Sequence, residues 1–416
     1  MTMIDPVTIG PDAVTSLVAY CEAQGLRRFT LISDANTFRA LGQRVEAALK
    51  QQGYDVATVV LDGKEVVADA HYILEALMAS QIGATTYLAV GSGTVTDITR
   101  FISYRTGNAF ISLPTAPSVD GFTSIGAPLI LRGVKRTLLC QAPTALFGDL
   151  QTLTEAPHAL VAAGYGDMVG KVTSVADWRL GSVVWGERYD AAVHQQFRAA
   201  IESCLAATPE VGKQSPEGVT KLLETLVESG FGMLAFGNSN PASGAEHHSS
   251  HYWEMLLLQE GRPALLHGAK VGYATIQVAR QYAKLRAMSR QELLDRLEAS
   301  TLPDRDAEIA IIRQGFPTVA DEVISDHKPF LDMTQEQYDQ LKQRIADCWD
   351  SIQEIAADVP PPEVITEYLD VAGAPTTTAA LGLSEDEIKL GFKYGHYLRQ
   401  RFSIMKLSRV LGLPMP

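Results

Sequence analysis

The sequence predicts an α/β fold in the first part of the chain and an all-helical fold in the rest. Before residue 154, short β-rich runs alternate with helical patterns, as in a parallel sheet covered by crossover helices. After that point strand-like runs give way to long helical stretches. A chain of 416 residues also exceeds what one hydrophobic core usually serves. We therefore predict a parallel-sheet domain over residues 1–153 and a helical domain over residues 154–416.

Strands and helices are expected to alternate in the first domain. Runs of β-branched and aromatic residues predict strands, and apolar residues three or four positions apart predict helices. The predicted strands are Arg28–Asp34, Val56–Leu61, Thr85–Val90 and Ala109–Leu113. The predicted helices are Phe38–Gln52, with Leu41, Val45 and Leu49 on one face, His71–Ser80, and a third with Ile98, Phe101 and Ile102 on its inner face. This order is typical of a nucleotide-binding sheet.

The second domain is predicted to consist of helices. The expected helices are Pro157–Trp178, Ala191–Ala207, Lys221–Phe231, Ser249–Gln259 and Arg290–Ala299. Two further long helices should begin at the capping-box pairs Thr334 with Gln337 and Ser384 with Glu387. The run Pro360, Pro361 and Pro362 lies between them and predicts a stiff turn.

Composition and charge exclude several classes of partner. The formal net charge is −13, which disfavours nucleic acid and anionic membranes as partners and leaves a small molecule. No apolar run approaches the roughly 20 residues of a membrane-spanning helix, and the first segment, MTMIDPVTIGPDAV, does not resemble a secretion signal. The four cysteines are far apart and form no CxxC pair. We expect reduced thiols and a cytoplasmic protein.

A glycine-rich turn, GSGTVTD, lies between a predicted strand and a predicted helix. Gly91 and Gly93 can adopt positive φ and let backbone N–H groups approach a pyrophosphate, while Thr94 and Asp97 have capping-box spacing. An ordinary strand-to-helix turn is the alternative. Asp34 ends the first predicted strand, where a carboxylate can accept hydrogen bonds from ribose hydroxyls or cap the next helix. Together these features favour NAD as the cofactor.

A metal site would have to be assembled from distant segments, because the sequence contains no HExxH or zinc-finger motif. The segments AGYGDMVGK, SGAEHHSSH and LLHGAKVG supply Asp167 at a predicted helix start, His247 near another, and His267. One carboxylate and two neutral imidazoles suit zinc, iron or nickel with an open position for substrate. Such an ion would lower the pKa of an alcohol so that hydride can leave.

Each of these residues also has a simpler interpretation. Asp167 would serve as a helix cap, His247 and His248 as a solvated pair, and His267 as a cation at a helix C-terminus or a hydrogen-bonded core residue. His251 follows His247 by four residues and would share its helical face, so these two could form a ligand pair. The residues alone do not decide which of the three histidines in this segment binds an ion.

Five motifs in this order resemble one known family. They are GSGTVTD, PTAPSVDGFTS, AGYGDMVGKVTSVADW, SGAEHHSSH and HGAKVG. The chain resembles the glycerol-1-phosphate dehydrogenase branch of the iron-containing alcohol dehydrogenase and dehydroquinate synthase superfamily, and within it the bacterial, arabinose-operon-associated members. The resemblance extends from Asp34 to the terminal segment RFSIMKL. It implies a Rossmann-like N-terminal domain, a helical C-terminal domain and an active site in the cleft between them.

The resemblance also implies roles for individual residues. Asp167, His247 and His267 correspond to metal ligands. The implied dinucleotide contacts are Gly93, Thr94, Asp97, Thr115, Ser118 and Ser124. Asp120 and His251 correspond to positions that contact the substrate. Asp120 follows a strand end, where its carboxylate could accept hydrogen bonds from substrate hydroxyls or belong to a turn.

Two lysines lie close in sequence to the implied metal ligands. Lys171 follows Asp167 by one helical turn and could pair with a substrate phosphate, although a surface position is the alternative. Many relatives in the superfamily have an acidic residue after the HG pair, whereas this chain has Ala269 and Lys270. The surroundings of the metal ligands therefore differ, and zinc and nickel both remain candidates.

The implied reaction is the reversible, NAD(H)-linked reduction of dihydroxyacetone phosphate to glycerol 1-phosphate. The metal would polarise the ketone, NADH would deliver hydride to C2, and a proton would arrive through water or His251. The alternatives are a dehydrogenase for an unphosphorylated polyol, a cyclase that uses NAD without net redox change, and a non-catalytic nucleotide-binding protein. A homo-oligomer is expected by resemblance. Lipid synthesis and polyol metabolism would both need this chemistry.

Overall fold

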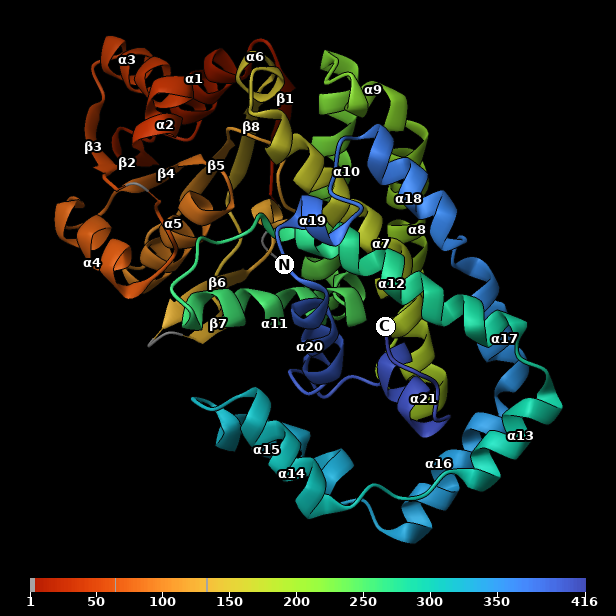
Figure 1. The fold of residues 1–416 in the computed structure, drawn as a ribbon. Coiled ribbons are helices and arrows are strands. Elements are labelled where there is room, and N and C mark those ends of the chain that lie inside the picture. The colour runs from red at the N-terminus through yellow and green to blue at the C-terminus, as the bar shows by residue number, and fades with distance from the viewer. Residues whose placement is uncertain (1–3, 64, 132–133) are drawn as a thin grey trace. The chain divides into compact units, whose positions relative to one another are not determined.

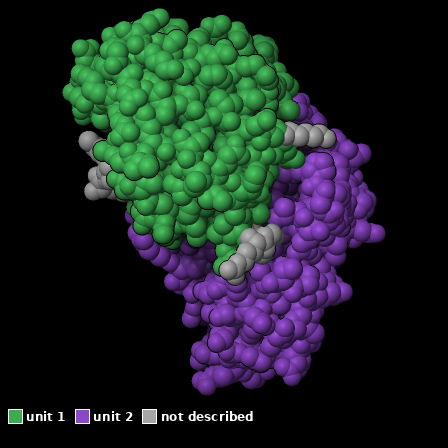
Figure 2. Space-filling view, turned by 90° about the vertical axis from the view of Figure 1, so that its left-hand side faces the viewer, with its two compact units in different colours: residues 1–168, 202–238 green, residues 169–201, 239–416 purple. Residues whose placement is uncertain are grey.

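The computed structural model describes residues 4–63, 65–131 and 134–416 (Figure 1). It divides into two units, and a six-stranded parallel sheet forms the centre of the first. Unit 1 comprises Met1–Met168 and Glu202–Asn238, and unit 2 comprises Val169–Ile201 and Ser239–Pro416 (Figure 2). The chain passes between the units three times: within α7 (His158–Trp185), within α8 (Ala191–Ala206), and between Asn238 and Ser239. The units therefore alternate along the chain, whereas the sequence predicted a single division after residue 153.

The sheet has the strand order β1-β8-β5-β4-β2-β3, with all neighbours parallel. Its strands are β1 (Val7–Gly10), β2 (Arg28–Asp34), β3 (Asp55–Leu61), β4 (Thr86–Gly91), β5 (Phe110–Pro114) and β8 (Ala145–Asp149). The four predicted strands are confirmed within one residue at each end. Strands β1 and β8 were not predicted, because both are short and contain glycine. A separate antiparallel hairpin consists of β6 (Gly126–Leu131) and β7 (Val134–Leu139).

Helices cover both faces of the sheet, as a doubly wound fold requires. Helices α1 (Ala13–Ala23) and α3 (Gln43–Gln51) pack on one face, in a core that includes Leu31 and Leu88. Helices α4 (Ala70–Ala79) and α5 (Gly93–Arg105) pack with Ile32 and Ala89 on the other. The predicted inner faces are largely confirmed: Leu41, Val45, Leu49 and Ile98 are fully buried, and Ile102 nearly so. Phe101 is only partly buried, but it packs against the same core.

The strand order reverses between β2 and β4. Strand β3 lies beyond β2 on one side, and β5 and β8 lie beyond β4 on the other. The register pairs Ile32 with Ala89, so the two strands end at Asp34 and Gly91 at the same edge of the sheet. Ligands of open α/β sheets bind at such a reversal, outside the carboxyl ends of the strands.

Short helices and one long helix complete unit 1. They are α2 (Ala35–Thr37), a π-helical turn (Phe38–Gly42), the 3₁₀ turn η2 (Gly121–Thr123), α6 (Leu150–Thr154), α9 (Thr208–Gly212) and α10 (Pro216–Phe236). Helix α10 packs against η2 and α6, which explains why a helical segment from the second part of the sequence belongs to the sheet-containing unit. This helix was predicted to begin at Lys221, which is five residues too late. It begins at Pro216, which occupies the first helical position, and the side chain of Ser215 caps it.

Unit 2 contains helices and no strand among its described residues. Besides parts of α7 and α8, it comprises η3 (Asn240–Ala242), α11 (Ala245–Gln259), α12 (His267–Ala287), α13 (Arg290–Ala299), α14 (Arg305–Gly315), α15 (Ala320–Leu331), α16 (Gln335–Asp347), α17 (Trp349–Asp358), α18 (Pro362–Val371), α19 (Thr378–Leu381), α20 (Glu385–Gly395) and α21 (Ile404–Val410). Both predicted capping boxes are confirmed, at Thr334 and Ser384. No helix in the described part of the chain combines the length and apolar character that crossing a membrane needs.

Candidate active site

The glycine-rich turn joins β4 to α5 at the strand-order reversal. A Cβ atom on Gly91 would lie 2.5 Å from Cβ of Val95, and one on Gly93 would lie 3.1 Å from Val119 Cγ2. Neither glycine is among the described residues with positive φ, so that expectation was wrong. Glycine is needed here because the backbone passes too close to its neighbours for a side chain. The first N–H groups of α5 lie in this turn and can bind an anion.

Thr94 and Asp97 do not form a capping box. Helix α5 begins at Gly93 with Ser92 as its N-cap, and no side chain caps it. Asp97 instead forms a 2.8 Å ion pair with Arg100. Helix α5 therefore begins one residue earlier than predicted. The proposed contacts of Thr94 and Asp97 with a dinucleotide stay predictions.

Arg100 is a structural residue of this site that the sequence analysis missed. Its side chain is fully buried and donates hydrogen bonds to the carbonyls of Gly121 at 2.5 Å and Gly126 at 2.8 Å. It therefore ties α5 to the loop that contains Asp120 and Ser124. The signal in the sequence was a cation between Ile98 and Phe101, which were predicted to lie on the inner face of this helix.

Asp34 caps the helix that follows β2. Its Oδ1 accepts hydrogen bonds from the backbone N–H groups of Asn36 at 2.8 Å and Thr37 at 2.9 Å. The helix-cap alternative is thus correct for this oxygen. A hydrogen bond from a ribose hydroxyl to Oδ2 is compatible with this arrangement and stays a prediction.

The segment after β5 holds the other unit 1 residues of the candidate site. Thr115, Ser118 and Ser124 are all buried, and the Thr115 N–H donates to the carbonyl of Gly91 at 3.3 Å. Asp120 does not cap η2 with its side chain. Its Oδ2 instead accepts a 2.8 Å hydrogen bond from Ser229 Oγ on α10. The loop therefore begins beside the glycine-rich turn.

Asp167 lies inside helix α7 and is completely buried, so both the predicted helix start and the helix-cap alternative were wrong. Its Oδ2 accepts a 3.0 Å hydrogen bond from the backbone N–H of Asp120. One turn earlier on α7, a Cβ atom on Gly164 would lie only 1.7 Å from the carbonyl oxygen of Pro117. The missing side chain at Gly164 allows α7 to approach the loop closely enough for this hydrogen bond.

His247 lies in the first turn of α11, close to two other histidines. The centre of its ring is 5.3 Å from that of His267, the first residue of α12, and 6.2 Å from that of His251. The rings of His251 and His267 stack at 5.4 Å. Because His267 begins a helix, its interpretation as a cation at a helix C-terminus was wrong.

Glu246 orients His247. It is fully buried, and its Oε1 accepts hydrogen bonds from His247 Nδ1 at 2.8 Å and from the Gly244 N–H at 2.6 Å, while Oε2 accepts one from Thr173 Oγ1 at 2.7 Å. Burial would raise the pKa of Glu246, but these hydrogen bonds lower it overall. A carboxylate on Nδ1–H leaves the Nε2 lone pair of His247 for a ligand. The sequence analysis missed this residue.

We expect Glu246→Gln to weaken binding of a divalent ion by about 10- to 100-fold, because the amide no longer fixes the tautomer and orientation of His247. Titration of the metal-free protein with zinc against a competing chelator measures this affinity. Thr173→Val is the matched control, since it removes a hydrogen bond to Glu246 but keeps the carboxylate, and should cause a smaller loss. Equal zinc affinity in wild type and Glu246→Gln would remove Glu246 from this role.

Lys171 and His248 do not lie at the surface. Lys171 is fully buried on α7, and its Nζ lies 3.2 Å from the Ala242 carbonyl and 3.5 Å from His247 Nε2. His248 is also buried, and its burial lowers its pKa well below the usual range. The surface alternative for Lys171 and the solvated pair of His247 and His248 were therefore wrong.

Two sets of side chains have the donor atoms of a metal site. His251, Glu254 and His267 form one set, and Asp167, His247 and His267 form the other; within each, one donor atom per residue lies within 4.8 Å of the others. The boundary between the units falls inside α7, and Asp167 precedes it by two residues on that continuous helix. Two neutral imidazoles and one carboxylate suit zinc, iron or nickel.

Glu254 already has a cationic partner. Its Oε2 lies 3.1 Å from Nζ of Lys270, whose side chain is fully buried, and 3.9 Å from His251 Nδ1. The lysine after the HG pair, which departs from the superfamily pattern, thus neutralises a carboxylate of α11.

Comparison with known proteins identifies similar sequences. A family model described as iron-containing alcohol dehydrogenase matches residues 8–157. A glycerol-1-phosphate dehydrogenase, NAD(P)+, of Halalkalibacterium halodurans is 45% identical over 282 residues, which are 67% of this chain and 71% of the relative. A protein of the same name from Bacillus subtilis is 34% identical over 407 residues, or 97% of this chain and 91% of the relative.

Solved structures share the fold at low sequence identity. A probable glycerol dehydrogenase from Sinorhizobium meliloti aligns with a TM-score of 0.61 at 18% identity, over 94% of this chain and 89% of the other. An iron-containing alcohol dehydrogenase from Corynebacterium glutamicum gives a TM-score of 0.61 at 14% identity, over 99% and 95%. At these identities the likeness concerns the fold alone, and it confirms the predicted fold class.

Proposed function

This chain belongs to the glycerol-1-phosphate dehydrogenase family of the iron-containing alcohol dehydrogenases, and we propose that it catalyses the metal-dependent, NAD(H)-linked interconversion of dihydroxyacetone phosphate and sn-glycerol 1-phosphate. The observation that supports this most directly is the donor set of Asp167, His247 and His267 in a chain that also has a glycine-rich turn at a strand-order reversal. A metal-dependent, NAD-linked dehydrogenase combines these two features.

Asp167, His247 and His267 are the proposed metal ligands. Glu246 holds His247 Nδ1, and the Asp120 N–H holds one oxygen of Asp167, so two of the three ligands are oriented by neighbouring groups. A divalent ion in this set would supply the Lewis acidity that polarises the C2 carbonyl of dihydroxyacetone phosphate. Zinc and nickel are the proposed ions, with iron as a third candidate, since all three accept imidazole and carboxylate ligands.

The cofactor is proposed to bind at the carboxyl edge of β4 and β2. Its pyrophosphate would lie at Gly91, Gly93 and the first turn of α5, near Thr94 and Asp97, with the adenosine ribose at Asp34. Further contacts are assigned to Thr115, Ser118 and Ser124. NADH bound there would supply the hydride. The carboxylate of Asp34 would repel the additional phosphate of NADP, so we propose a preference for NAD.

Three other residues are proposed to bind and protonate the substrate. Asp120, whose Oδ2 accepts a hydrogen bond from Ser229 Oγ, would accept hydrogen bonds from substrate hydroxyls. Lys171 would attract the phosphate, because a buried ammonium group interacts strongly with an anion in a site that excludes water. His251, which is partly exposed, would deliver the proton to the product oxygen directly or through water.

We further propose a cytoplasmic homo-oligomer. The location is supported by the four cysteines, none of which forms a disulfide, and the oligomer by the family resemblance. Native mass spectrometry of the purified protein measures the subunit number, and fractionation of the producing cells shows the compartment.

An NADH oxidation assay tests the proposed function. Metal-loaded protein should oxidise NADH when dihydroxyacetone phosphate is added. EDTA treatment should lower this rate by at least about 100-fold, because without the ion the negative charge that develops on the carbonyl oxygen in the transition state is no longer stabilised. Adding back zinc, nickel or iron should restore it. Full activity in the stripped protein would rule out a catalytic metal.

The same assay separates the alternative functions. Dihydroxyacetone should be a poor substrate, whereas equal rates with and without the phosphate would indicate a dehydrogenase for unphosphorylated polyols. A cyclase would show no net consumption of NADH, and a non-catalytic nucleotide-binding protein would bind NADH without any turnover. Parallel assays with NADPH test the preference assigned to Asp34.

A further inference from the structure

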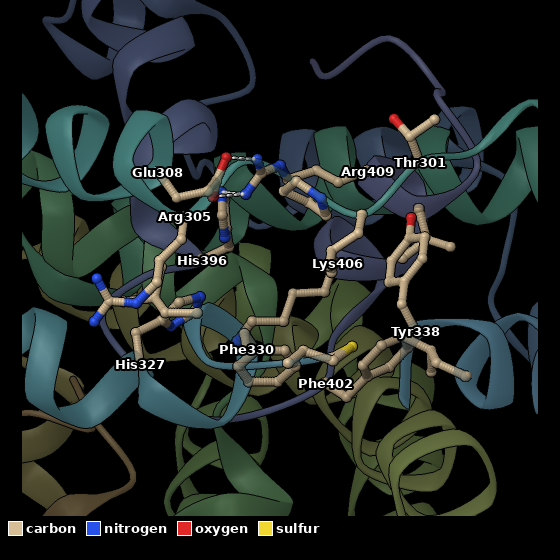
Figure 3. Close-up of a pocket in the computed structure, with 16 residues that line it drawn as sticks. Thr301, Arg305, Glu308, His327, Phe330, Tyr338, His396, Phe402, Lys406 and Arg409 are labelled. Atoms are coloured by element: carbon tan, nitrogen blue, oxygen red, sulfur yellow. Dashed lines mark hydrogen bonds and ion pairs between the residues drawn. The ribbon is translucent and has the colours of Figure 1, made fainter. Parts of the chain in front are cut away.

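A cavity in unit 2 lies outside the residues assigned to catalysis. It encloses about 110 Å³ between α14, α15, α16, the end of α20 and α21 (Figure 3). Much of its wall is apolar, formed by residues that include Leu302, Phe330, Leu331, Leu341 and Phe402. Cavities of similar size in other proteins hold a molecule about as large as benzene. The walls would therefore suit a small ligand with an apolar body.

His396 belongs to the wall of this cavity and has one ring nitrogen without a partner among the described residues. It is 3% exposed, and burial lowers its pKa well below the usual range, so its ring is neutral. Its Nε2 lies 3.4 Å from Nη1 of Arg409. Since a guanidinium can only donate, Nε2 is the acceptor and the proton lies on Nδ1. Among the described residues, Nδ1 has no hydrogen-bond partner.

His327 is a second buried imidazole in the cavity wall. It stacks on Phe330 with 4.9 Å between the ring centres and is 3% exposed. Burial lowers the pKa of His327 to about 2, so this ring is also neutral. Its Nδ1 has no partner within the described part of the chain. A buried polar atom without a partner is uncommon in proteins and requires an explanation.

The cavity wall includes an ion pair and a buried lysine. Arg409 and Glu308 form an ion pair, with Nη1 2.9 Å from Oε2, so their charges offset each other. Lys406 is buried, donates to the carbonyls of Arg399 at 3.0 Å and Arg401 at 2.6 Å, and lies 4.1 Å from the centre of the Phe330 ring. Burial lowers the pKa of Lys406 to about 7, although the carboxylates of Glu187 and Asp177 act in the opposite direction. A carboxylate bound beside Lys406 would stabilise its ammonium form.

We propose that this cavity binds a small monocarboxylate with an apolar body, whose carboxylate accepts a hydrogen bond from His396 Nδ1 in the positive field of Lys406. The apolar walls exclude a strongly hydrated ligand, and the unpartnered N–H of His396 together with the ammonium form of Lys406 favours an acceptor with negative charge. A dianionic phosphate fits less well, because Glu308 lies in the same wall and a second negative charge would have to be desolvated.

Ligand titrations of the full-length protein test the charge requirement. Benzoate and butyrate are the probes, and benzamide and butyramide are their neutral counterparts of nearly equal shape. In isothermal titration or ligand-observed NMR, we expect saturable binding of at least one carboxylate at millimolar or lower concentration and at least about tenfold weaker binding of its amide, as loss of a charge-assisted hydrogen bond implies. Equal binding of acid and amide, or no binding of either acid, would overturn the proposal.

Variants of His396 test the assigned donor. His396→Leu removes the N–H and should weaken carboxylate binding by about tenfold, whereas His396→Asn can place an amide N–H near the position of Nδ1 and should retain most of it. Val410→Trp, on α21, should fill the cavity and abolish binding. Thermal melting shows whether each variant is folded. Unchanged benzoate binding in both His396→Leu and Val410→Trp would place the bound acid elsewhere and contradict the proposal.

Discussion

Replacing His247 with alanine is expected to lower kcat/KM for the reduction of dihydroxyacetone phosphate by about three to four orders of magnitude. Its Nε2 is one of three donor atoms within 4.8 Å of one another, and Glu246 holds the other ring nitrogen. Without this imidazole the ion would keep one carboxylate and one histidine, which is too few for a stable site. Steady-state kinetics, with metal analysis of the protein after dialysis, measures both losses.

The neighbouring histidines of α11 are the matched controls, because the sequence alone left open which of them binds the metal. His248→Leu should keep the metal and most of the activity, since His248 belongs to neither donor set. His251→Ala should keep the metal but lower kcat, because it removes the proposed proton donor and none of the proposed ligands. If His251→Ala lost the metal while His247→Ala retained it, the set of His251, Glu254 and His267 would be the metal site instead.

Much of the fold followed from periodicity in the sequence. Apolar residues at helical spacing correctly predicted the buried faces of the helices that cover the sheet, as Val45 and Ile98 show. Periodicity gave no indication of β1 or β8, because strands of four or five residues are too short to show a pattern of their own. Helix α10 comes from the second part of the sequence, yet it belongs to unit 1. This membership depends on packing between distant segments, which local patterns do not encode.

The candidate site was predictable as a set of segments and less so as individual contacts. The glycine-rich turn lies at the expected strand end, but the structure attributes its glycines to close packing rather than to positive φ. Glu246 stands beside His247 in the predicted motif, yet nothing in the sequence indicated that a glutamate would be buried among three hydrogen-bond donors. Burial of a charged residue depends on partners that are distant in sequence, and Thr173 is one of them.

Gly164→Ala is expected to destabilise the protein by about 3 kcal/mol, near the upper end for an overpacked core. The added methyl group would lie 1.7 Å from the carbonyl oxygen of Pro117. The position of the methyl group is fixed by the backbone of α7 and the oxygen belongs to the backbone of the loop, so no side-chain rotation can relieve the clash. Either α7 or the loop must move. For a unit of this size, the melting temperature should fall by roughly 10 °C.

The same displacement should also affect the candidate site, because the Asp120 N–H that holds Asp167 follows Pro117 by three residues. We expect weaker zinc binding in Gly164→Ala at a temperature where the variant is folded. Gly121→Ala is the matched control for stability: it lies in the same loop, has no positive φ, and its Cβ would have no described atom within 4 Å. If Gly164→Ala melted with Gly121→Ala and bound zinc as tightly, close contact between α7 and this loop would not be what positions Asp167.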